Sequence, residues 1–169
     1  LTDKELIEIG SELGADIPFF LSENRFAYGT GRGDIIQSIK TEAKLWHILV
    51  KPEFGVQTKD VYGKTSGLSL TKGNGVDKMR VAFLSGKYME NLQDNCCNDL
   101  QYIVLQEFPI IGEIISVLMK NGAKTALLSG SGPTVFGIFD KVNIDEAEIN
   151  IRQCFKVKKN WEIYVASTF

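Results

Sequence analysis

The sequence has little of the two residue types that most often hold metals or form disulfides. Its 169 residues include one histidine and three cysteines, namely Cys96, Cys97 and Cys154. The cysteines are odd in number, two of them are adjacent, and no CxxC or Cys/His metal-ligand spacing is present. This pattern excludes a regular disulfide framework and a zinc-finger-like site. We therefore expect no metal site built by this chain and a reducing, cytoplasmic compartment.

The sequence also lacks a strong net charge and a long apolar run. Its formal net charge is −2, with acidic and basic residues interspersed. A nucleic-acid-binding protein would show a basic stripe, whereas the one short basic cluster, Lys156–Lys159, is typical of a solvated turn. The sequence contains no run of about 18 apolar residues, so it predicts no membrane-spanning helix. We expect neither nucleic acid nor a membrane as a partner.

Two familiar catalytic patterns can be excluded. His47 lies inside a predicted strand, with no second histidine and no adjacent serine or cysteine, so it does not indicate a catalytic triad. Gly63-Lys64-Thr65 resembles the end of a phosphate-binding P-loop, but that motif requires glycine at position 58, where Thr58 stands. We therefore interpret His47 as structural and residues 63–75 as a mobile loop.

Hydrophobic periodicity predicts an α+β chain. A first helix begins at the capping box Thr2-x-x-Glu5 and stops at Gly14. Further helices are predicted over 57–62 with Thr58 as N-cap, and over 76–85, 98–108, 110–121 and 144–155; strands are predicted over 17–21, 25–28, 35–39, 45–51, 126–128, 135–139 and 161–166.

The order of these elements predicts two domains, residues 1–43 and residues 44–169. From residue 45 onward the order is strand, helices, strand, strand, helix, strand, which is close to a ferredoxin-like α/β sandwich with extra helices in its first crossover. Residues 1–43 supply only a helix and a hairpin, typical of the tail of a preceding domain. Since the sequence enters a helix pattern directly at Leu1, we expect that it starts within a longer protein.

A small-residue turn, Gly130-Ser131-Gly132, joins the two strands of Leu127–Asp140. Glycine permits close backbone approach, and successive N–H groups in such a turn can bind an anion. Glycine and serine are also common in ordinary β-turns. From these residues alone, both an anion site and a plain turn stay open.

Asp16 lies between a helix end and the predicted apolar strand over 17–21. It is interpreted either as a turn residue that bonds to the local backbone, or as an acid whose apolar neighbours Ile17, Phe19 and Phe20 desolvate it and tune it as a base. Position alone leaves both interpretations open.

Taken in order, several motifs together resemble the GHMP kinases, and most closely the members that phosphorylate 4-diphosphocytidyl-2-C-methyl-D-erythritol. The resemblance spans essentially the whole chain and rests on Leu13–Phe20, Gly29-Thr30-Gly31, the set Pro52, Val56, Thr58, Val61 and Tyr62, the pair Asn98-Asp99, and Leu128–Thr134. It implies the GHMP kinase fold, with the tail of a ribosomal-S5-like N-terminal domain followed by the ferredoxin-like C-terminal domain.

The resemblance implies a role for each matching residue. Asp16 corresponds to the catalytic aspartate, Gly130, Ser131 and Gly132 to the motif that shapes the ATP and phosphate pocket, and Thr30 and Thr58 to positions on the substrate side. Tyr62 corresponds to an aromatic residue that stacks on the cytosine ring, although a helical tyrosine can also pack into a core. Asn98-Asp99 is interpreted as a helix cap with a structural role.

The implied activity is ATP-dependent phosphorylation of the 2-hydroxyl of that cytidyl substrate, in non-mevalonate isoprenoid biosynthesis. The family's N-terminal lysine and its Gly/Ser-rich phosphate loop are missing from the sequence. ATP and Mg²⁺ would be held mainly by that part, so we expect this chain to be inactive alone and to need the missing segment or a self-association partner. Alternatives are another small-alcohol kinase, of the mevalonate or homoserine type, and a non-catalytic ligand-binding module.

Overall fold

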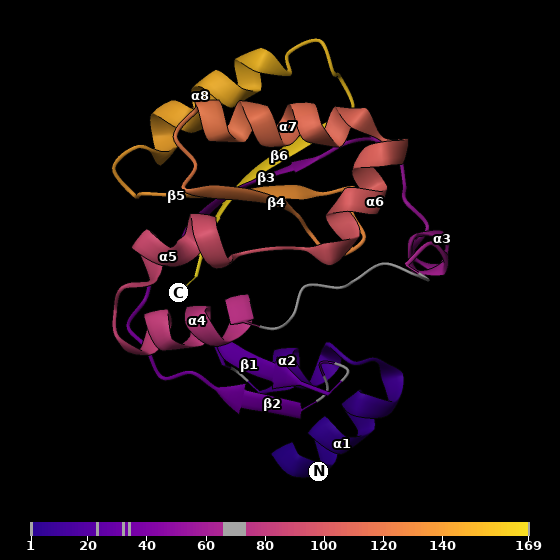
Figure 1. Cartoon of the computed structure of the whole chain (residues 1–169), viewed down its shortest axis with the longest axis vertical. Helices are drawn as coiled ribbons and strands as arrows, with labels where there is room; N and C mark the ends of the chain where they lie inside the picture. The colour runs from indigo at the N-terminus through magenta and orange to yellow at the C-terminus, as the bar shows by residue number, and fades with distance from the viewer. Residues whose placement is uncertain (1, 23, 32, 34, 66–73, 169) are drawn as a thin grey trace. The chain divides into compact units, whose positions relative to one another are not determined.

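The computed structural model describes residues 2–22, 24–31, 33, 35–65 and 74–168 (Figure 1). These residues form two compact units. The first unit contains the N-terminal residues up to 43 together with residues 80–88, and the second contains residues 44–79 and 89–168. Residues 66–73, most of the loop predicted over 63–75, lie outside the described residues.

The first unit begins with helix α1 (Asp3–Leu13), which the predicted capping box starts. The Glu5 N–H donates to Thr2 Oγ1 at 3.3 Å, and the Thr2 N–H donates to Glu5 Oε2 at 2.7 Å. Strands β1 (Ala27–Thr30) and β2 (Ile35–Ser38) form an antiparallel hairpin. Both the capping box and the hairpin predicted from the sequence are confirmed.

The strand predicted over residues 17–21 is wrong, because these residues form the short helix α2 (Ile17–Leu21). Pro18 lies in the first turn of α2, where proline is favourable because no N–H is needed there. The helix packs on α1 at Gly10, where an added Cβ would lie 2.6 Å from Leu21 Cδ1. A short apolar run does not distinguish strand from helix by periodicity, and this close packing decides for the helix.

The second unit is built on a four-stranded antiparallel sheet in the order β4-β5-β3-β6. Its strands are β3 (Trp46–Lys51), β4 (Thr125–Leu128), β5 (Val135–Phe139) and β6 (Glu162–Ser167). In chain order this sheet reads second, third, first, fourth, which is the strand order of a ferredoxin-like sandwich. The predicted topology of this part is confirmed.

Within the described ranges, five helices lie in the first crossover and one in the second. The crossover from β3 to β4 contains α3 (Thr58–Gly63), α4 (Asn74–Leu84), α5 (Tyr88–Asn95), α6 (Asp99–Glu107) and α7 (Pro109–Lys120), and α8 (Ile144–Cys154) connects β5 to β6. The sequence missed α5, whose one buried residue is Leu92 and whose apolar periodicity is correspondingly weak. It also placed one N-cap wrongly, because Gln57 caps α3 and Thr58 is its first residue.

The core of the second unit lies between the sheet and helices α7 and α8, which cover the same face of the sheet in Figure 1. Helix α7 buries Ile111, Ile114 and Leu118, each fully inaccessible to solvent, in one core cluster with Ile48 and Val50 of β3. Among the described residues, no single helix is long and apolar enough to cross a membrane; α6 and α7 reach that length and composition only together, with a bend of 118° between them.

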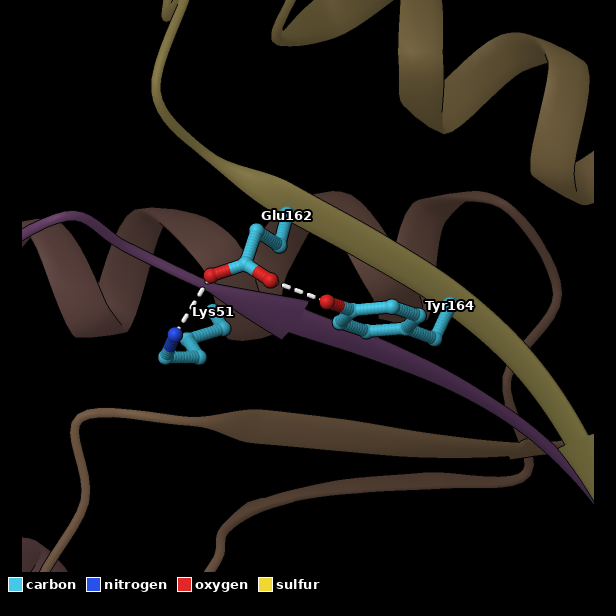
Figure 2. A network of polar contacts seen from close by, with 3 residues as sticks. All are labelled: Lys51, Glu162 and Tyr164. Atoms are coloured by element: carbon cyan, nitrogen blue, oxygen red, sulfur yellow. Dashed lines mark hydrogen bonds and ion pairs between the residues drawn. The ribbon is translucent and has the colours of Figure 1, made fainter.

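Strand β6 is an edge of the sheet, and charged groups occupy its exposed end. Lys51 and Glu162 face each other across β3 and β6, and Glu162 accepts hydrogen bonds from the Lys51 ammonium and the Tyr164 hydroxyl (Figure 2). The bond to Glu162 raises the pKa of Lys51, and the bond from Lys51 lowers the pKa of Glu162. Charged side chains on an edge strand disfavour edge-to-edge pairing with other chains.

The single histidine provides a direct test of the sheet. Burial lowers the pKa of His47 from its ordinary value of 6.5, and a hydrogen bond to the Ala166 backbone partly offsets this effect. The imidazole of His47 therefore binds a proton more readily in the unfolded chain than in the folded one. The free energy of unfolding should decrease as pH falls from the pKa of His47 in the unfolded chain to its lower pKa in the folded chain. We expect an NMR titration of the one imidazole to give a pKa below 6.5; a value at or above it would contradict the burial of His47.

Candidate functional site

A pocket of about 550 Å³ opens in the second unit between α3, the start of α6 and the turn that joins β4 to β5. Most of its wall is apolar or aromatic, and polar groups enter it from the two helices and the turn. Its lining comprises Tyr62, Thr65, Cys97, Asn98, Asp99, Leu100, Leu127, Leu128, Gly130 and Phe136. Among the described residues, none of those that line the pocket is a lysine or an arginine.

The turn between β4 and β5 has two glycines with positive φ, Gly130 at 57° and Gly132 at 83°. The Ser129 N–H donates to the Thr134 carbonyl at 2.8 Å, and the Gly132 N–H donates to the Ser129 carbonyl at 2.9 Å. Within the described part of the chain, the N–H groups of Gly130 and Ser131 donate to no other residue. Successive free amides in a turn of this kind suit an anion, so the anion site is the interpretation that the geometry favours.

Gly132 is required at its position for a second reason. A Cβ at Gly132 would lie 2.7 Å from Leu128 Cδ1 and 3.4 Å from Leu128 Cγ. Leu128 is 1% exposed and belongs to the core cluster, so it has little room to move aside. No such contact surrounds Gly130, where nothing lies within 4 Å of an added Cβ.

Asn98 connects the start of α6 to this turn. Its Oδ1 accepts from the Leu100 N–H at 3.0 Å, which confirms it as the N-cap of α6. Its Nδ2 also donates to the carbonyl oxygens of Leu128 at 2.8 Å and Gly130 at 2.7 Å. Gln101 adds a parallel contact, since its Oε1 accepts from the Leu128 N–H at 2.9 Å. The sequence indicated the cap but not the contacts with residues about 30 positions away.

Helix α3 brings Tyr62 to the pocket and Thr58 to the adjoining turn. The hydroxyls of Thr58 and Ser131 lie 2.8 Å apart, and at the other end of the helix Lys64 forms an ion pair with Glu107 of α6. Val61 is buried, whereas Tyr62 is 58% exposed and lines the pocket. Tyr62 is therefore not a core residue, which removes the structural alternative considered for it.

Asp16 and Thr30 lie together in the first unit, beside the turn of the β1–β2 hairpin. Thr30 ends β1 and accepts from the Gly33 N–H at 3.0 Å, and a Cβ built on Gly33 would lie 3.8 Å from Asp16 Oδ1. Asp16 immediately precedes α2 and is exposed to solvent. The expectation that Ile17, Phe19 and Phe20 desolvate Asp16 is therefore wrong, because the turn into α2 directs the aspartate to the surface.

The structure thus groups the predicted residues in two sets. Thr58, Tyr62 and the glycines and serine of the β4–β5 turn surround or adjoin one pocket of the second unit, while Asp16 and Thr30 adjoin one turn of the first. The sequence analysis did not identify Thr65, Cys97, Leu127 or Phe136 as lining residues. Each of them lies in an ordinary loop or strand pattern that gives no signal of a binding site. Among the described residues, no group of three or more His, Cys, Asp or Glu side chains could hold a metal ion.

Residues 79–157 match the family described as GHMP kinases C terminal. The chain is 39% identical over 146 residues to 4-diphosphocytidyl-2-C-methyl-D-erythritol kinase of Geobacter sp. (strain M21), which covers 85% of this chain and 49% of that protein. It is 42% identical over 138 residues to the protein of the same name from Bacillus cereus (strain B4264), with 82% of this chain and 47% of that protein covered.

A solved structure agrees with these relatives in fold. The crystal structure of a 4-(cytidine 5'-diphospho)-2C-methyl-D-erythritol kinase superimposes on 95% of this chain and 56% of its own, with a TM-score of 0.68 and 20% sequence identity. The chain spans about half the length of the curated relatives it matches. The similarity confirms the GHMP kinase fold and the resemblance on which the expected site residues depend.

The two turn glycines permit a matched stability test. We expect Gly130→Ala to lower the free energy of unfolding by about 1–2 kcal/mol, the cost of a left-handed non-glycine residue. Gly132→Ala carries the same backbone cost plus overpacking against Leu128, which adds about 1–3 kcal/mol. Urea unfolding monitored by circular dichroism measures both. Equal losses in the two variants would show that Leu128 does not restrict position 132.

Proposed function

We propose that the chain, whose residues 79–157 match the family described as GHMP kinases C terminal, is part of an ATP-dependent kinase for 4-diphosphocytidyl-2-C-methyl-D-erythritol. The enzyme would transfer the terminal phosphoryl group of ATP to the 2-hydroxyl of this substrate in isoprenoid biosynthesis. The observation that carries the proposal is the pocket, where the exposed Tyr62 lies near a turn in which the Gly130 and Ser131 N–H groups donate to no described residue. The names of the relatives support the same substrate.

The pocket suits a cytidine diphosphate group on chemical grounds. Tyr62 supplies an exposed aromatic face on which the cytosine ring can stack, a contact that contributes roughly 1–3 kcal/mol. The N–H groups of Gly130 and Ser131 can bind phosphate oxygens. The N-terminus of α6 adds the positive end of a helix dipole at the same pocket.

The chemical step in this proposal uses Asp16. Phosphoryl transfer depends on positioning and on stabilising the phosphate charge, with one group to orient the attacking hydroxyl. The substrate 2-oxygen bonds to the terminal phosphorus of ATP, the bond from that phosphorus to ADP breaks, and the hydroxyl proton passes to the Asp16 carboxylate. Thr30 and Thr58 would contact the substrate side. ATP and its Mg²⁺ would be held mainly by the rest of the whole protein, where the ion would neutralise negative charge on the phosphate groups.

The proposal also assigns the two parts of the chain. Residues 1–43 would belong to the N-terminal catalytic domain, and residues 44–169 would form the C-terminal domain that recognises the cytidyl group. The remainder of the whole protein would supply the main ATP contacts, and the chain alone would bind ligand without turnover. The whole protein would act in the reducing cytoplasm, where free cysteines such as Cys96, Cys97 and Cys154 are common.

Substitution of Tyr62 tests substrate recognition. We expect Tyr62→Ala to weaken CDP binding by about 5- to 150-fold, since loss of base stacking costs roughly 1–3 kcal/mol. Tyr102→Ala is the matched control, because Tyr102 is 63% exposed on α6 and is not part of the pocket lining. Calorimetric titration with CDP measures both variants. The cytidyl substrate would be rejected if Tyr62→Ala bound CDP as tightly as the unsubstituted chain does. It would also be rejected if the unsubstituted chain bound mevalonate or homoserine but not CDP.

Substitution of Asp16 tests the chemical step in the full-length kinase. We expect Asp16→Asn to lower kcat by at least about 100-fold, the low end for loss of a positioned base. Glu12→Gln, another exposed carboxylate of the first unit, should leave kcat unchanged. The measurement is ADP release that depends on the cytidyl substrate. A decrease of less than about threefold in Asp16→Asn would remove Asp16 from the mechanism.

A further inference from the structure

Asn98 makes more contacts than a helix cap requires. An N-cap needs only a side-chain oxygen that accepts from the first turn of its helix, and Asp or Ser fulfils this role about as well as Asn. Asn98 meets that need through Oδ1, yet its amide nitrogen also donates to two carbonyl groups of another element, those of Leu128 and Gly130. Both protons of the amide group are therefore used, and only an amide side chain combines this acceptor with two donors.

The two carbonyls that Asn98 binds determine the shape of the turn. A peptide group is planar, so a carbonyl that is held in place also fixes the direction of the N–H that follows it. The Leu128 carbonyl orients the Ser129 N–H, which donates to Thr134 across the turn. The Gly130 carbonyl orients the Ser131 N–H, one of the two amides of the turn that donate to no other described residue.

We propose that Asn98 is a positioning residue that holds the Ser129–Thr134 turn in the conformation that binds the phosphate groups of the ligand. This inference rests on the proposed function, because it assigns the free amides of the turn to a diphosphate. Asn98 acts through the turn and need not touch the ligand. Its helix-capping role and its positioning role use different atoms, Oδ1 and Nδ2, so substitution can separate them.

The test uses substitutions that keep the cap and remove the donors. Asn98→Asp preserves an N-cap oxygen but presents a carboxylate to two carbonyl oxygens, and Asn98→Ser removes the paired donors without adding charge. Gln101→Ala is the matched control, because it breaks a contact of similar length between α6 and Leu128 but leaves both carbonyls bound to Asn98. Amide hydrogen exchange of Ser129 and Gly132 and titration with CDP are measured by NMR on each labelled chain.

We expect the Ser129 and Gly132 amides to exchange about tenfold faster in both Asn98 variants, because their acceptors lie in the released turn. CDP affinity should fall at least about fivefold in these variants and less than about twofold in Gln101→Ala. Wild-type exchange and affinity in Asn98→Ser would overturn the inference. An equal loss in Gln101→Ala would also overturn it, since any contact between α6 and β4 would then suffice.

The same data separate this inference from the proposed function. A wild-type chain that does not bind CDP contradicts the cytidyl ligand, while the exchange rates still decide whether Asn98 holds the turn. A wild-type chain that binds CDP, together with Asn98 variants that bind it equally well, contradicts only the role of Asn98.

Discussion

The hydrogen bonds from Asn98 to the carbonyls of Leu128 and Gly130 are the contacts on which the geometry of the candidate site depends most. They join the start of α6, the end of β4 and the glycine turn into one arrangement. Leu128 is also a buried core residue, and a Cβ added at Gly132 would lie 2.7 Å from its Cδ1. Packing against Leu128 and the hydrogen bonds from Asn98 thus both restrict the conformation of the turn. The Gly130 and Ser131 N–H groups donate to no described residue and can bind a ligand.

Helix α3 completes the site because a side-chain contact at each of its ends connects it to the glycine turn or to α6. The hydroxyl contact between Thr58 and Ser131 attaches its first residue to the turn, and the ion pair of Lys64 with Glu107 attaches its end to α6. Because Val61 is buried, the neighbouring Tyr62 lies on the exposed side of α3. An aromatic side chain and the Gly130 and Ser131 amides are therefore held at one pocket by one set of packed elements.

Much of the fold follows from local sequence signals, and most of the site does not. The capping box at Thr2, the β1–β2 hairpin and the strand order of the second unit depend on short-range patterns and are correctly predicted. Periodicity does not distinguish strand from helix over the five apolar residues 17–21, whose helix is favoured by the packing of Ile17 and Leu21 on Gly10. Helix α5 gives a weak sequence signal because Leu92 is its one residue recorded as buried. The exposure of Asp16 and the contacts of Asn98 arise from tertiary packing, to which a single sequence gives no local clue.

The central claim is that the glycine turn and Tyr62 together bind a cytidine diphosphate group. The most direct test is to titrate CDP into the isotope-labelled chain and map the chemical-shift changes residue by residue. The account predicts the largest changes at the Gly130 and Ser131 amides and at the Tyr62 ring, with few changes in β6 and α8. Changes centred on another surface, or none at millimolar CDP, would contradict it.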